Sequence, residues 1–148
     1  MQNSIIRFSS PPPNGVTGWA ILRAFLGPAT SQVSPQLPVF VIPGTAATLD
    51  SGYRQGHILC TAATAVTLTL RANNPAAPNT TLDWKSGDYF SVVQKGTGQV
   101  TVSPAAGVVI EIPTGFSART RARYSVISFV CDDPSTNTWT IGNDMAAA

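Results

Sequence analysis

Ionic side chains are scarce in this sequence. Only 11% of its 148 residues are charged, Glu occurs once and Lys twice, whereas a typical soluble domain carries about 25% charged residues. Nine basic and seven acidic residues leave a net charge of +2, which is too weak for a general nucleic-acid binder that neutralises many phosphates. We expect a surface of hydroxyls and amides instead, because the chain holds seventeen Thr, thirteen Ser and seven Asn.

Groups for acid–base and metal chemistry are equally few. One His and one Glu give general acid–base catalysis little to use. Cys60 and Cys131 are far apart and match no zinc spacing, and the Asp residues follow no calcium-loop pattern. We therefore expect no enzyme, no cofactor and no metal site. His57 is expected to begin a strand and Cys60 to fill a core position.

No segment has the length or composition of a membrane span or leader. The longest apolar run, Trp19–Leu26, is interrupted by Arg23 and is far shorter than the ~20 residues a spanning helix needs. The first residues lack the basic start and apolar centre of a signal peptide. We expect no membrane contact, synthesis in a reducing cytosol and two free thiols.

Proline divides the chain into two regions. Residues 1–56 hold seven of the twelve prolines, and proline interrupts sheet pairing. The sequence therefore predicts an extended N-terminal arm over 1–56, with short strands at Ser4–Phe8 and Val39–Ile42 and a short helix at Gly18–Leu26. Large apolar side chains that the arm cannot bury by itself predict a partner-binding surface: Ile5, Ile6, Phe8, Trp19, Leu22, Phe25 and Leu26. The alternative is that the segment around Trp19 packs on the sandwich of its own chain.

Residues 57–148 show the period of two that is typical of strands. Val66, Leu68 and Leu70 alternate with threonines, which predicts one buried and one exposed face. Further strands are expected around 89–95, 99–103, 108–112, 123–131 and 138–141, with a hairpin connection at Gly96–Gly98. The predicted fold class is all-β, a β-sandwich or jelly-roll-like domain that follows the proline-rich arm.

Three stretches of this β region resemble a small domain that recurs in virion proteins of tailed bacteriophages. They are the Val/Thr alternation at 63–70, the SVVQKGTGQVTV segment within 87–102, and the RYSV strand at 123–126 leading to NTWTIGND at 137–144. The resemblance covers roughly residues 57–144 and leaves 1–56 unmatched. It implies a structural role in a tail fibre, a head fibre, or a capsid decoration or cement protein.

Of these roles we expect capsid decoration, because a 148-residue chain with one arm and one β domain has no shaft repeat or heptad pattern. Such a protein would bind the major capsid protein on the outer capsid surface and stabilise the head, after assembly in the host cytoplasm. An arm that adds a strand to a neighbour uses backbone hydrogen bonds and few charges. We expect a homo-oligomer, a dimer or trimer. The alternative is a tail-fibre or head-fibre domain that contacts host surface glycan.

Two further candidate sites each keep two interpretations. Arg119, Arg121 and Arg123 would share one face of a strand, ~7 Å between successive residues. This row would meet an acidic partner or would be a solvated strand start. Trp84, in the loop over 73–87, would either stack on a sugar ring in the fibre alternative or anchor its loop to the domain.

Overall fold

The computed structural model describes residues 36–74, 76–79 and 81–148. Within them Leu37–Ala148 form one compact unit. The predicted strand Ser4–Phe8, the predicted helix Gly18–Leu26 and the apolar arm residues lie outside the described residues: Ile5, Ile6, Phe8, Trp19, Leu22, Phe25 and Leu26. Their predicted partner-binding role stays a prediction.

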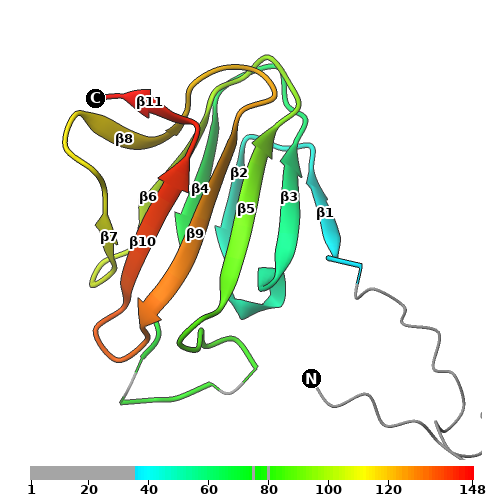
Figure 1. Cartoon of the computed structure of the whole chain (residues 1–148). Coiled ribbons are helices and arrows are strands. Elements are labelled where there is room, and N and C mark those ends of the chain that lie inside the picture. Colours follow the sequence, from blue (N-terminus) through cyan, green and yellow to red (C-terminus); the bar gives the residue numbers. More distant parts are fainter. Residues whose placement is uncertain (1–35, 75, 80) are drawn as a thin grey trace, which may run out of the picture. The chain divides into compact units, whose positions relative to one another are not determined.

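The described chain forms two packed β-sheets (Figure 1), so the predicted all-β sandwich is confirmed. The six-stranded sheet has the order β1 (Val39–Ile42), β3 (Gly56–Cys60), β5 (Tyr89–Gln94), β9 (Val126–Asp133), β10 (Thr138–Asn143) and β7 (Val109–Glu111). The five-stranded sheet has the order β11 (Met145–Ala147), β8 (Phe116–Thr120), β6 (Val100–Pro104), β4 (Val66–Leu70) and β2 (Ala46–Leu49).

The first six strands alternate between the two sheets. β1, β3 and β5 pair in parallel in one sheet, and β2, β4 and β6 pair in parallel in the other. The six strands form three successive coils, β1 with β2, β3 with β4 and β5 with β6, and each coil lies on the coil before it. Among the later strands, β9 pairs antiparallel with β5 and β10, β8 pairs antiparallel with β11 and β6, and β7 pairs in parallel with β10. Of the two predicted architectures, the sandwich describes this fold, since a jelly roll is built from antiparallel Greek keys.

The predicted hairpin at Gly96–Gly98 is wrong. This segment crosses from β5 to β6, which lie in different sheets, and it rests directly on the crossing segment of the preceding coil. The Gly96 and Gly98 N–H groups donate to the carbonyls of Cys60 and Ala62 at 2.9 and 3.2 Å. A Cβ at Gly98 would stand 1.7 Å from the Thr64 carbonyl oxygen, so glycine is needed here for close approach of two backbones.

The compact unit begins earlier than the sequence boundary at residues 56 and 57. β1, β2 and a 3₁₀ helix at Ser51–Tyr53 all lie before His57 and belong to the sandwich. The strand predicted at Val39–Ile42 is confirmed. Its flanking residues Pro38 and Pro43 are compatible with the sheet because β1 is an edge strand, where proline is tolerated.

Aromatic rings fill the core between the sheets. Phe90 stacks on Phe129 with ring centroids 5.0 Å apart, and Trp139 lies 5.6 Å from Phe90. Cys60 and Cys131 are free and buried in the same core. Burial raises the pKa of each thiol to about 11, so both remain protonated and act as small apolar side chains.

Candidate functional site

A groove opens in the five-stranded sheet where β6 and β8 separate. The two strands pair at a single position, Thr101 with Arg119, and Figure 1 shows β8 turning away from the direction of β6. The groove has a volume of about 520 Å³ and is lined by Thr101–Pro104, Ile110, Ile112, Ser117–Arg119 and Ala148.

Local sequence explains why the two strands part. β6 ends at Pro104, which has no N–H to continue a ladder. The chain then enters β8 through a turn in which the Phe116 N–H donates to the Pro113 carbonyl at 3.1 Å. Gly115 in this turn has φ 86°, a left-handed conformation that glycine adopts without strain. The turn sets the direction of β8, and the Ala148 N–H holds the final strand beside it by donating to the Gly115 carbonyl at 3.0 Å.

The groove combines apolar walls with one charged side chain. Ile110 and Ile112 form part of the wall, and Ile112 is 40% exposed. Arg119 is held in place because its Nε donates to the Ser117 hydroxyl at 3.1 Å and its Nη2 donates to the Ala147 carbonyl at 3.4 Å. Chemically, this arrangement suits an aliphatic or aromatic side chain of a partner with an oxygen acceptor beside it.

The structure does not place the three predicted arginines on one strand face. β8 ends at Thr120, so only Arg119 lies in a strand, while Arg121 and Arg123 lie in the turn before β9. Tyr124 in that turn has φ 71°, and this left-handed residue reverses the chain before β9 begins. The alternation that predicted a row therefore does not extend beyond Arg119.

The two turn arginines stabilise the turn itself. The Arg121 Nε donates to the Asp144 carboxylate at 2.6 Å, and the Ser125 hydroxyl donates to its other oxygen at 2.6 Å. These hydrogen bonds lower the pKa of Asp144, the bond from Arg121 first. Arg123 donates from Nε to the Lys95 carbonyl at 2.9 Å. Since the Arg121–Asp144 pair is solvent-exposed, it orders the turn more than it stabilises the fold.

Trp84 anchors its loop and does not offer a face to a ligand. Its side chain is 2% exposed, and its ring meets Trp139 edge-on at 4.9 Å and Phe90 at 5.6 Å. A buried ring cannot stack on a glycan, so of the two interpretations the structure supports the anchor. The Nε1 atom of Trp84 is buried and has no hydrogen-bond partner among the described residues.

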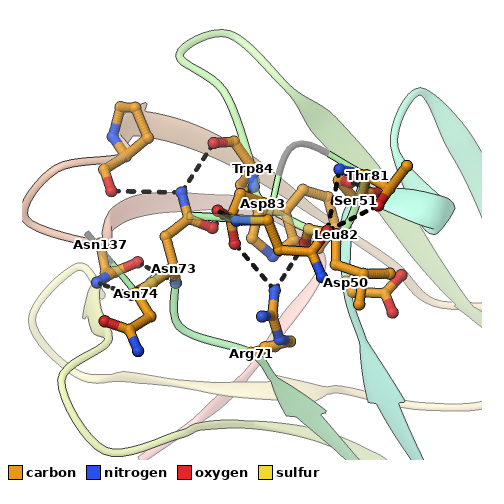
Figure 2. A network of polar contacts seen from close by, with 12 residues as sticks. Asp50, Ser51, Arg71, Asn73, Asn74, Thr81, Leu82, Asp83, Trp84 and Asn137 are labelled. Carbon is orange, nitrogen blue, oxygen red and sulfur yellow. Dashed lines mark hydrogen bonds and ion pairs between the residues drawn. The ribbon is translucent and has the colours of Figure 1, made fainter. Parts of the chain in front are cut away.

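A polar network holds the loop that carries Trp84 (Figure 2). Asn73 accepts from the Trp84 N–H and donates to the Trp84 carbonyl, both at 2.8 Å, and its own N–H donates to the Asn137 side chain at 2.6 Å. Arg71 pairs with Asp83 at 3.1 Å. This network was not predicted, because nothing in the spacing of two asparagines 64 residues apart indicates that they meet. These contacts within the chain indicate a structural role.

The groove residues were also missed, apart from Arg119. A short apolar segment around Ile110 and Ile112 indicated a strand, yet no local pattern shows that β6 and β8 separate. Across residues 36–74, 76–79 and 81–148, no group of three or more His, Cys, Asp or Glu side chains is placed to hold a metal ion. No helix in this part of the chain is long and apolar enough to span a membrane.

The described chain is thus an all-β sandwich with a groove between β6 and β8, and this groove has apolar walls and one charged side chain, Arg119. Comparison with protein-family models and with curated protein sequences finds no match to this chain.

Proposed function

We propose that this chain is a non-enzymatic structural protein of a bacteriophage virion, and specifically a decoration protein that binds the outer surface of the capsid. Two independent features support the proposal. One is the resemblance of residues 63–70, 87–102 and 123–144 to a small β domain of tailed-phage virion proteins. The other is the groove between β6 and β8, whose chemistry suits a protein partner.

The groove is the observation that carries the proposal. Ile112 in the groove is 40% exposed, and Phe116, which precedes the lining residue Ser117 in β8, is 46% exposed. Full burial of one such side chain contributes about 1.5–3 kcal/mol, so the groove and its rim give a modest affinity per site. A capsid lattice repeats the same site many times, but the occupancy of independent sites depends on the affinity and the free protein concentration and not on the number of sites. A modest affinity per site is therefore sufficient to coat the particle where one bound unit engages more than one site. Arg119 adds one salt-sensitive contact.

The alternative, a fibre domain that contacts host glycan, keeps only the sequence resemblance as support, since Trp84 is buried. Copy number separates the two roles. A stained gel of purified virions, with band intensity compared with the major capsid protein, is expected to give hundreds of copies per particle. A few tens or fewer would contradict decoration and favour a fibre.

A pelleting assay tests the groove itself. Purified protein is mixed with undecorated shells, and the fraction that sediments with them is measured. We expect Ile112→Asp to reduce bound protein at least tenfold, because a carboxylate would be buried against apolar groups. Val130→Asp is the matched control, since Val130 is similarly exposed at 41% but lies in β9 of the other sheet. Equal pelleting of both variants and the unmodified protein would reject the groove as the capsid contact.

A further inference from the structure

The outer edge of β1 is an unpaired strand edge in a sequence segment that carries no charge. β1 ends the six-stranded sheet, and among the described residues no strand pairs with its outer side (Figure 1). No charged residue occurs from Gln36 to Leu49. The Val39 and Val41 side chains point outward and are 58% and 60% exposed. Natural proteins usually protect such an edge with charges or very short strands.

The other three sheet edges in the described part of the chain carry some of these protections. β7 and β11 have three residues each, and β7 contains Glu111. β2 exposes only Ala46 and Thr48, and it runs directly into Asp50. β1 is also short, with four residues, and Pro38 and Pro43 bracket it. It nevertheless carries no charge and exposes two large apolar side chains, so it is the edge at which another strand would add most readily.

Hydrogen bonds inside the sandwich show which backbone groups face this edge. The Pro38 carbonyl accepts from the His57 N–H at 2.8 Å, and the Ile42 carbonyl accepts from the Thr61 N–H at 3.0 Å. Because successive residues of a strand turn their backbone groups to opposite sides, Val39 and Val41 direct their N–H and C=O groups away from β3. Two donors and two acceptors thus lie along the outer edge.

This edge matches itself across a two-fold axis. In an antiparallel pair centred on Phe40, Val39 of one copy faces Val41 of the other, and the reverse pair is equivalent. Each pair exchanges two hydrogen bonds, so all eight edge groups are satisfied. The next edge-facing positions, Leu37 and Pro43, also fall opposite each other, and Pro43 has no N–H, so the ladder ends symmetrically. The four exposed valines then meet on one face, with no like charges opposed.

We propose that β1 is a self-association edge, through which a second copy of this chain joins the six-stranded sheet and forms a two-fold dimer. The inference does not depend on the virion role, because it concerns the purified protein alone. An oligomer of this kind would present two grooves to a partner and so strengthen attachment by avidity.

Sedimentation equilibrium of the full chain tests the proposal. We expect a species of twice the 15.5 kDa chain mass. Val41→Pro removes only a donor that faces the outer edge, and should weaken dimerisation at least tenfold. Val41→Lys places a charge on the same edge without a proline and should act likewise. Val130→Lys is the matched control, because it exposes an equivalent charge on the central strand β9, and it should remain dimeric.

Amide hydrogen exchange gives a second readout. Protection of the Val39 and Val41 amides should rise with protein concentration and follow the dimer fraction. The proposal is overturned if the unmodified chain is a monomer at about 1 mM, or if it forms a trimer. It is also overturned if Val41→Lys and Val130→Lys associate equally. Protection of both amides in the monomer would show that another part of the same chain, such as residues 1–35, covers the edge, which also rejects the dimer.

Discussion

Substitution of Gly98 by Ala tests the stacked crossing segments directly. Gly98 lies where the chain passes from β5 to β6, on top of the segment that joins β3 to β4. A Cβ there would stand 1.7 Å from the Thr64 carbonyl oxygen and 2.2 Å from its carbonyl carbon. Both are backbone atoms, so neither rotates away as a side chain would. The two segments must move apart by more than an ångström before ordinary van der Waals contact is restored.

The expected cost combines two effects. Overpacking of a close contact typically costs about 1–3 kcal/mol, and separation of the segments weakens the 3.2 Å hydrogen bond from the Gly98 N–H to the Ala62 carbonyl, which contributes about 1 kcal/mol. The free energy of unfolding should fall by about 2–4 kcal/mol. For a domain of this size, roughly 4 °C per kcal/mol gives a decrease in Tm of about 8–16 °C.

Gly44 supplies a matched control, since it occupies the equivalent crossing segment of the first coil. Its Cβ would have no neighbour nearer than the Ala46 carbonyl oxygen at 4.0 Å, and neither glycine has a positive φ. Gly44→Ala should change stability by about 0.5 kcal/mol or less. Urea denaturation of both variants, followed by far-UV circular dichroism, measures the difference. If Gly98→Ala is as stable as Gly44→Ala, the coils do not stack as described.

Two further predictions concern the turn before β9 and the core. Because hydrogen bonds from Arg121 and Ser125 hold the pKa of Asp144 below its ordinary 3.8, its stabilising contribution is complete above that value and is lost as pH falls through the lower folded pKa. Asp144→Asn should therefore have a lower Tm than the unmodified protein at pH 7, with the gap closing in more acidic solution; a gap that stays constant with pH would contradict this. Since burial raises the pKa of Cys60 and Cys131 to about 11, iodoacetamide at pH 8 should label neither thiol in the folded protein and both in denaturant; labelling without denaturant would show that the core opens at these residues.

Strands were the most predictable level of this structure, because their signal is local. Val66, Leu68 and Leu70 alternate with threonines in the sequence, and in the structure all three are fully buried while Thr67 is exposed. β1 was recognisable for a similar reason, since an apolar run between two prolines has few other stable conformations. Such patterns depend only on which face of a strand meets the core.

Connectivity was less predictable, because a glycine-rich turn between two alternating segments has two physical solutions. It can fold the second strand back beside the first, or it can cross to the opposite sheet. Which one forms depends on what lies above and below the turn, here the carbonyls of Cys60 and Ala62 that accept from Lys95, Gly96 and Gly98. These partners lie more than thirty residues away in the sequence, and the period of two is the same in both solutions.

The candidate binding surfaces were hidden for the same physical reason. Charges and large aromatic rings are the side chains that stand out in this sequence, and they indicated Arg119, Arg121, Arg123 and Trp84. In the structure Arg121 and Arg123 bind their own turn and Trp84 enters the core. The two surfaces that we propose for partners lie instead where strand pairing stops, between β6 and β8 and along β1. Where pairing stops is a property of the whole sheet. The unpaired backbone and aliphatic side chains of both proposed surfaces therefore have no distinctive pattern in the sequence.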